Sequence, residues 1–249
     1  RDKIHATAYG IQERNGIAWA YMGKCKGADR PSLPDLESTM LNAEHTEIWT
    51  AQRECNFMQA LEGDIDTSHL GFLHMGAIRA EEAPAKSFNY YTVADRSPRY
   101  HVIDTDSGTM YAAYRPAEAD TYYYRFAQFL MPCFTMIPTN ALGIQVITRA
   151  WVPLDDNHTM FWTISAPTAK GERAAGPRTA ATFTGTARGP VFLENTSEWL
   201  GRWRLKNNAG NDYGLDRVLQ RAGKDSGVDG SYTGIDGIHL QDQAITESM

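Results

Sequence analysis

The stretch IQVITRAWVPLDDNHTMFWTIS, residues 144–165, places two runs of alternating apolar and polar side chains around a short polar segment. Alternation with a period of two is typical of a β-strand with one buried face. The segment Asp155-Asp156-Asn157 is made of residue types that favour turns. Because no helix fits between the two runs, we expect them to pair as antiparallel strands.

The same pattern continues toward the start of the chain. Apolar-rich runs follow one another at close spacing, with turns expected at residues 106–108 and 116–120, which indicates further antiparallel strands. Ahead of these runs, residues 3–23 form two apolar segments around Asn15-Gly16, a strong signal for a hairpin. The other expected strands cover residues 46–55, 87–94, 99–104, 109–115 and 121–132.

Helices are expected in three places: residues 59–75, 211–222 and 239–249. Residues 168–189 are rich in Ala, Gly, Thr and Arg, and we expect a mobile surface connection there. Strands that follow one another without intervening helices, together with a few separate helices, predict the α+β class. The expected architecture is one large antiparallel sheet with helices packed on one face.

The composition narrows the classes of function. The 249 residues carry a net charge of −6, which does not mark a nucleic-acid-binding surface. No apolar run approaches the roughly 20 residues of a membrane helix. Three widely spaced cysteines argue against a disulfide framework and against a cysteine-based metal cluster, so we expect a reducing, cytoplasmic setting. Since the chain begins at Arg1 and ends in TESM, we expect it to be a segment of a longer polypeptide.

One stretch, EGDIDTSHLGFLH at residues 62–74, has the residue types of a metal site. His69 and His74 are five positions apart, about 140° around an ideal helix, so they reach one ion only if the helix is broken or widened near Gly71. Asp66 lies three residues before His69 and can orient that imidazole. The alternative is a surface helix with two unrelated histidines.

This stretch also resembles a known family. The pattern Asp66-x-x-His69-x-x-x-x-His74, preceded by NFMQALEGD, resembles the mononuclear-iron motif of Rieske non-haem iron oxygenases, in particular phthalate 4,5-dioxygenase-like oxygenase components. The likeness runs from about residue 3 to the end of the chain. Further segments that resemble the family, in the same order, are GIAWAYMG, PSLPDLE, FLMPCFTMIP, NDYGLDR and GIDGIHLQDQAITESM.

The resemblance implies a fold and a ligand set. The fold is a helix-grip domain, in which a large curved antiparallel sheet wraps around helices. A mononuclear Fe(II) is held by His69, His74 and Asp242, although the residue pattern alone favours a solvated helix acid at position 242. Glu247 is the alternative ligand if the alignment shifts. His239 is expected to pack beside the site or to support a ligand.

The resemblance also implies a larger assembly. The family carries a CxH…CxxH module for a Rieske 2Fe-2S cluster upstream, and no such spacing occurs in this sequence. We therefore expect residues 1–249 to be the mononuclear-iron catalytic domain, without the Rieske domain and with the final helix truncated. Electrons from NAD(P)H would pass through a flavin/iron–sulfur reductase and the cluster, and then through Asp66 to the iron of a neighbouring subunit. The family forms homotrimers or hexamers.

The implied reaction is O₂-dependent cis-dihydroxylation of an aromatic carboxylate such as phthalate, with monooxygenation or O-demethylation of a related acid as the alternative. An arginine would hold the carboxylate through two hydrogen bonds. Arg99 is the first candidate, followed by Arg115 and Arg79, although the residue pattern alone favours a solvated charge at a strand end for each of them. Phthalate-like substrates and O₂ are thus the expected small-molecule partners, with no nucleic acid and no membrane.

Two other classes of protein remain open from the residues. One is a helix-grip module that carries a small hydrophobic ligand without a catalytic metal. The other is a zinc hydrolase, although the glutamate that such enzymes place beside the first histidine is absent. The metal that the protein binds separates the three classes: iron for the oxygenase, zinc for the hydrolase, and none for the carrier.

Overall fold

A seven-stranded antiparallel sheet forms the centre of the computed structural model, which describes residues 6–138, 143–174, 191–222 and 232–249. The strand order is β3-β9-β8-β7-β6-β5-β4, and each neighbouring pair runs antiparallel. This confirms the predicted sheet. The strands are β3 (Glu47–Arg53), β4 (Arg99–Thr105), β5 (Gly108–Pro116), β6 (Tyr122–Leu130), β7 (Phe134–Met136), β8 (Gln145–Pro153) and β9 (Thr159–Pro167).

Residues 144–165 form the β8–β9 hairpin, as their alternation predicts. Trp151 pairs with Phe161 across the two strands, and both side chains are buried. They pack with Ala60 and Leu61 of helix α2 (Phe57–Ile65) in the main apolar cluster. The alternation of this one hairpin therefore selects the face of the sheet that the helices cover.

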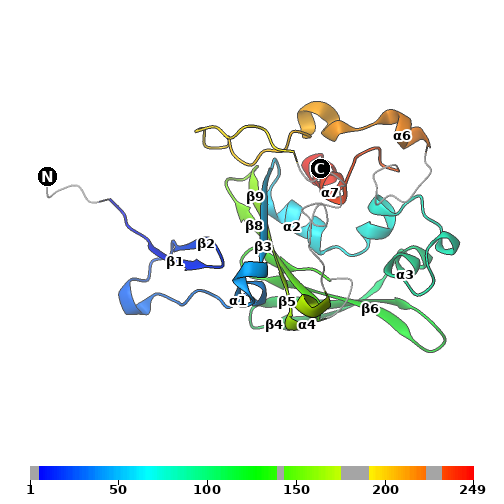
Figure 1. Ribbon diagram of the computed structural model, residues 1–249, viewed down its shortest axis with the longest axis horizontal. Coiled ribbons are helices and arrows are strands. Elements are labelled where there is room, and N and C mark those ends of the chain that lie inside the picture. Colours follow the sequence, from blue (N-terminus) through cyan, green and yellow to red (C-terminus); the bar gives the residue numbers. More distant parts are fainter. Residues whose placement is uncertain (1–5, 139–142, 175–190, 223–231) are drawn as a thin grey trace.

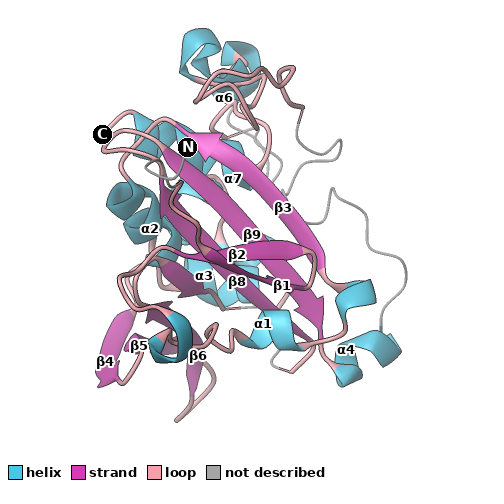
Figure 2. Cartoon of the chain, turned by 90° about the vertical axis from the view of Figure 1, so that its left-hand side faces the viewer, coloured by secondary structure: helices cyan, strands magenta, loops and turns pink. Residues whose placement is uncertain are grey.

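Three helices lie on that face: α2, α3 (Phe88–Ala94) and α7 (Ile238–Glu247), which Figure 1 shows on the same side of the sheet. Helix α1 (Glu37–Met40) packs on the opposite face, where Ser38 donates to Thr148 over 2.7 Å. Figure 2 shows α1 and α4 (Ala169–Ala174) near one end of the long strands β3, β9 and β8. The remaining helix and short helical turns are α6 (Arg217–Ala222), η1 (Gly27–Asp29), η2 (Ala43–His45), η3 (Leu70–His74), η4 (Ala80–Glu82) and η5 (Ala209–Gly214).

The prediction of a strand at residues 87–94 is wrong, because residues 88–94 form helix α3 and Ser87 caps it. The Ser87 hydroxyl caps the helix by accepting a hydrogen bond from the Tyr90 amide at 3.1 Å. Tyr91 is buried and stacks on Tyr123 of β6, with ring centroids 4.6 Å apart. Packing against the sheet thus outweighs the strand preference of an aromatic and β-branched segment.

Two of the predicted helices are divided in the structure. Residues 59–75 separate into α2 and η3, because Asp66 ends α2 in an extended conformation with φ −68° and ψ 113°. Residues 211–222 separate into η5 and α6, and Asp212 and Tyr213 within η5 have positive φ angles. Of the predicted surface connection at residues 168–189, α4 occupies the first part, and residues 175–189 lie outside the described residues.

The N-terminal hairpin stands apart from the central sheet (Figure 1), with β1 (Gly10–Arg14) and β2 (Ile17–Tyr21) paired antiparallel. Asn15 and Gly16 both adopt positive φ angles, 49° and 78°, as the Asn-Gly turn signal predicts. Among the described residues the longest helix is α7 with 10 residues, so no described helix is long enough to cross a bilayer.

Candidate metal centre

A π-helical turn brings the two histidines of the motif together. In η3 the Met75 amide donates to the Leu70 carbonyl at 3.1 Å, a five-residue hydrogen bond that widens the helix. The Nε2 atoms of His69 and His74 consequently lie 3.2 Å apart. The turn begins beside Gly71, where the sequence allows the break or widening that a metal shared by both histidines requires.

Gly71 also lets this turn approach helix α3 closely. A Cβ atom at Gly71 would stand 3.1 Å from the carbonyl oxygen of Thr92 and 3.2 Å from Cγ of Arg96. Arg96 in turn donates to the Met75 and Ile78 carbonyls at 3.3 and 2.8 Å. The π-helical turn is therefore held against α3 by close backbone packing and by one arginine.

Asp242 of α7 completes the cluster. Its Oδ1 lies 3.0 Å from Nε2 of His74 and 3.5 Å from Nε2 of His69. Ligand atoms that share one first-row ion at about 2.1 Å and at right angles stand about 3.0 Å apart. The three side chains therefore fit one metal ion, with all three donors on one side of it, and no other such group is found among the described residues.

The other ring nitrogen of each histidine has an acceptor that fixes its tautomer. Nδ1 of His69 lies 2.5 Å from the Asp66 carbonyl oxygen, and Nδ1 of His74 lies 2.7 Å from Oε1 of Gln241. Because both partners are acceptors, each Nδ1 carries the proton and each Nε2 presents its lone pair to the cluster. Gln241, which holds a candidate ligand in place, is a residue that the sequence pattern does not indicate.

The charges around the cluster favour a bound cation. Burial by itself raises the pKa of Asp242, but His74, then His69 and Arg53, outweigh burial and hold that pKa below its usual range. Burial lowers the pKa of His74, and Asp242 outweighs it, so that this pKa ends above its usual value. The ionised carboxylate beside the two imidazoles thus favours positive charge at this place, which a metal ion would supply.

His239 and Glu247, the other two residues expected near the centre, do not belong to the metal cluster. His239 packs on Trp49 and Phe161, with ring centroids 4.6 and 5.1 Å away, as expected for a packing residue. Burial, followed by the charge of Arg53, lowers the pKa of His239 well below its usual value, so the ring is neutral. Glu247 accepts hydrogen bonds from the Glu54 amide and the Tyr213 hydroxyl at 2.7 and 2.8 Å, outside the cluster that Asp242 completes.

Asp66 contacts the first ligand through its main chain rather than through its carboxylate. Oδ2 of Asp66 lies 3.8 Å from Nδ1 of His69, while the carbonyl oxygen makes the short contact. The carboxylate instead accepts from the Ser68 and His69 amides at 2.8 and 3.0 Å. Burial raises the pKa of Asp66, but the hydrogen bonds from Ser68 outweigh it and leave the pKa lowered. The side chain is 40% exposed and therefore reaches the molecular surface.

The three candidate arginines lie in different environments. Arg99 is exposed on the edge strand β4, and Arg79 is exposed and paired with Glu82 at 3.0 Å. Arg115 of β5 is fully buried, and its Nε donates to the Asp95 carbonyl at 2.6 Å. The structure thus brings Arg115 into the interior on the helix-covered face and leaves the other two at the surface.

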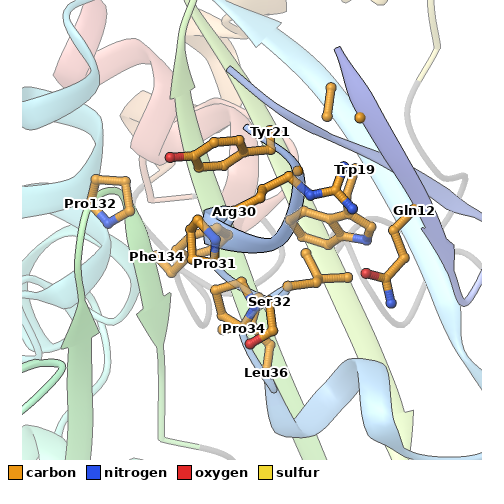
Figure 3. Close-up of a pocket in the computed structure, with 14 residues that line it drawn as sticks. Gln12, Trp19, Tyr21, Arg30, Pro31, Ser32, Pro34, Leu36, Pro132 and Phe134 are labelled. Carbon is orange, nitrogen blue, oxygen red and sulfur yellow. The ribbon is translucent and has the colours of Figure 1, made fainter. Parts of the chain in front are cut away.

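A separate cavity of about 570 Å³ lies between the N-terminal hairpin and the opposite face of the sheet. Figure 3 shows Trp19, Tyr21 and Arg30 around it, together with Pro132 and Phe134. None of the predicted site residues lines this cavity. It is therefore distinct from the metal cluster.

The fold and the cluster together define a class. Two histidines and a carboxylate on one side of a metal site are the ligand set of mononuclear non-haem iron oxygenases. A broad antiparallel sheet with helices on the ligand-bearing face is the architecture of the catalytic domain of Rieske-type oxygenase subunits. The chain belongs to the family described as LigXa C-terminal domain like, which matches residues 20–249.

Curated relatives agree with this assignment. The oxygenase subunit of 3-chlorobenzoate-3,4-dioxygenase from Comamonas testosteroni is 39% identical over 251 residues, covering 100% of this chain and 56% of the relative. The oxygenase subunit of phthalate 4,5-dioxygenase from Pseudomonas putida is 31% identical over 259 residues, covering 99% of this chain and 53% of the relative. The chain thus spans about half the length of these relatives.

A solved structure is similar at lower sequence identity. Dicamba monooxygenase bound to 3,6-dichlorosalicylic acid has a TM-score of 0.45 and 14% sequence identity, covering 67% of this chain and 52% of that one. The fold assignment rests on the sheet and helices of this chain rather than on that likeness.

Proposed function

We propose that residues 1–249 are the mononuclear-iron catalytic domain of an oxygenase subunit that cis-dihydroxylates an aromatic carboxylate such as phthalate. The observation that carries the proposal is the convergence of His69, His74 and Asp242 at 3.0–3.5 Å from one another. The names of the two relatives, a 3-chlorobenzoate dioxygenase and a phthalate dioxygenase, support both the reaction and the class of substrate.

Iron(II) held by His69, His74 and Asp242 would supply the ability to activate O₂. The chain's own residues hold the histidines in place: the Asp66 carbonyl and Gln241 accept the Nδ1 protons, so that both Nε2 atoms would be free to bind the metal. His239, three residues before Asp242 on α7, packs on Trp49 and Phe161 and so anchors the helix that carries this carboxylate.

Electron delivery through Asp66 is part of the proposal. Its carbonyl accepts a hydrogen bond from the ring of His69, and its carboxylate is partly exposed. One residue therefore joins a candidate iron ligand to the molecular surface. A Rieske 2Fe-2S cluster, reduced from NAD(P)H by a flavin/iron–sulfur reductase, would meet this surface from a neighbouring subunit of a trimer or hexamer. Since reduced cofactor is its electron source, we place the reaction in the cytoplasm.

The test uses an oxygenase subunit that contains this chain, supplied with reductase, NADH, O₂ and either phthalate or 3-chlorobenzoate. The expected product is a cis-dihydrodiol, with one iron for each chain. A monohydroxylated or demethylated product would assign the same centre to a monooxygenase or O-demethylase. Zinc in place of iron would favour a hydrolase, and a protein that binds neither metal would favour a ligand carrier.

A further inference from the structure

One buried arginine contacts the helix that carries the third candidate ligand. Arg53 is the last residue of β3, where it pairs with Thr159 of β9, and its relative exposure is 2%. Its Cζ atom lies 4.9 Å from the ring centroid of Trp151 and 5.6 Å from that of Phe161. Strand pairing and the two aromatic rings therefore hold this guanidinium in one place inside the molecule.

From this place Arg53 reaches α7 at two points. Its Nη1 donates to the Thr246 hydroxyl at 3.2 Å, and its Nη2 lies 3.3 Å from Nδ1 of His239. Since a guanidinium only donates, Nδ1 of His239 is the acceptor and the proton of this neutral ring lies on Nε2. His239 and Thr246 are seven residues apart, which puts them about 20° apart around an ideal helix. Arg53 thus binds one line of side chains across two turns of α7.

Asp242 lies between these two points. It follows His239 by three residues and precedes Thr246 by four, so the three are neighbours on the helix surface. The Thr246 hydroxyl that accepts from Arg53 also donates to the Asp242 carbonyl at 2.9 Å. The same hydroxyl lies 3.3 Å from the Gln243 carbonyl. One hydroxyl therefore connects Arg53 to the main chain of the candidate ligand.

The position of α7 decides whether the third ligand reaches the cluster. Oδ1 of Asp242 lies 3.0 Å from Nε2 of His74 and 3.5 Å from Nε2 of His69, and both histidines belong to another part of the chain. Only the docking of α7 sets these two distances. Anchoring points on either side of Asp242 resist rotation of the helix about its axis and sliding along it.

We propose that Arg53 is a positioning residue for the metal centre, which fixes through His239 and Thr246 the turn of α7 from which Asp242 reaches the ion. This inference rests on the proposed function and adds to it a residue outside the ligand set.

The charge of Arg53 acts on the centre in the opposite sense. Burial lowers the pKa of Arg53, and Asp242 is the strongest of the charges that oppose this shift, so the guanidinium and the carboxylate lie near one another. A cation near the cluster repels a metal ion. Removing the arginine therefore weakens metal binding if its hydrogen bonds position Asp242, and tightens metal binding if only its charge matters.

The experiment compares the parent chain with Arg53→Met, which keeps a long side chain and loses the charge and both hydrogen bonds. Competition with a chelator gives the Fe(II) affinity, and the EPR spectrum of the Co(II)-loaded protein reports how the ligands are arranged. We expect Fe(II) binding to weaken about 10-fold. The Co(II) spectrum should broaden, because Asp242 then takes more than one position. Tighter Fe(II) binding in Arg53→Met would overturn the proposal in favour of a role for the charge alone.

A second pair of variants keeps the test independent of how well Arg53→Met folds. Thr246→Val keeps the shape of the side chain and loses the hydroxyl, whereas Thr246→Ser keeps the hydroxyl. We expect the Val variant to weaken Fe(II) binding and broaden the Co(II) spectrum, and the Ser variant to match the parent. Since Arg53 and Thr246 act together, the effect of Val should be smaller in the Arg53→Met background. Equal effects of Val in both backgrounds would contradict the proposal.

A control variant separates positioning from general stability. The Tyr213 hydroxyl donates to Oε2 of Glu247 at 2.8 Å, near the end of α7. Tyr213→Phe should lower the melting temperature and leave the Fe(II) affinity and the Co(II) spectrum as in the parent. If it broadens the spectrum as much as Arg53→Met does, any loosening of α7 disturbs the centre and the specific role of Arg53 is refuted. A lower melting temperature of Arg53→Met with unchanged metal readouts would refute it as well.

The metal content of the parent chain keeps this test separate from that of the proposed function. An iron-loaded parent whose Arg53 and Thr246 variants keep its Fe(II) affinity and Co(II) spectrum would refute the positioning role alone. A parent that binds Co(II) and not Fe(II), with a spectrum that depends on Arg53, would support the positioning role and refute the oxygenase.

Discussion

At the scale of single residues, the metal ligands carry the strongest prediction. We expect Ala in place of His69, His74 or Asp242 to remove the bound iron, because two ligands on one side do not retain the ion during purification. Elemental analysis of the purified variants measures this. His158→Ala is the matched control, since His158 pairs with Asp155 at an exposed turn. Full iron occupancy in His69→Ala would contradict the assignment.

Gln241 provides a second test, of an interaction that no sequence pattern indicates. Its Oε1 accepts the Nδ1 proton of His74, so Gln241→Leu should retain the fold and weaken iron binding about 10- to 100-fold. Gln241→Glu keeps an acceptor at the same place and should bind iron more tightly than the Leu variant. Competition with a chelator gives the two affinities. Equal affinities in both variants would mean that the hydrogen bond does not support the ligand.

The sequence predicts the role of an individual residue only where that residue type has few possible roles. Two histidines five positions apart beside Gly71 indicate a shared ion only with a widened helix, which the structure contains. Asp242 is recognised by resemblance alone, because an acid in an amphipathic helix is ordinarily solvated. The sequence does not indicate Gln241 either, since its contact with His74 depends on how α7 is oriented against the π-helical turn.

At the scale of elements, the π-helical turn is stable because it packs closely on α3. Gly71→Ala would place a methyl group 3.1 Å from the Thr92 carbonyl oxygen. We expect a loss of about 1–3 kcal/mol in the free energy of unfolding, measured by chemical denaturation. Phe72→Ala in the same turn is the control, because its side chain is 54% exposed and should change stability by less than about 0.5 kcal/mol. A neutral Gly71→Ala would show that α3 can move away.

Helices and strands are predicted well where alternating apolar and polar residues mark a buried face. They are predicted poorly where tertiary packing decides between helix and strand. The β8–β9 and β1–β2 hairpins follow from alternation and from turn residues. Helix α3 does not, because Tyr90, Tyr91, Thr92 and Val93 favour strands. The Ser87 cap and the stacking of Tyr91 on the sheet reverse that preference.

At the scale of the whole molecule, electron supply sets what the chain can do. The sequence has three widely spaced cysteines and no CxH…CxxH pair. We therefore expect the iron-loaded chain to form no product with reductase, NADH and phthalate, while an oxygenase subunit that includes a Rieske domain turns over. Product from the chain alone would show that the proposed electron route is wrong.

In the proposed electron route, Asp66 connects the site to the Rieske domain of a neighbouring subunit. Asp66→Asn keeps an acceptor for the Ser68 amide and leaves the carbonyl contact to His69, so iron should be retained. We expect turnover of the complete oxygenase to fall sharply, measured as product formed per reduced cluster. Ser248→Ala, at an exposed position after α7, is the control. Unchanged turnover would remove Asp66 from the electron path.

The three candidate ligands come from two distant parts of the chain, and this has a thermodynamic consequence. His69 and His74 share one helical turn, whereas Asp242 reaches them only while α7 is docked against it. A bound ion therefore acts as a cross-link that closes the long loop from His74 to Asp242 and reduces the freedom of the opened chain. Loss of the ion and detachment of α7 become one coupled equilibrium, so amide protons of α7 exchange with solvent at a rate that falls as free iron rises.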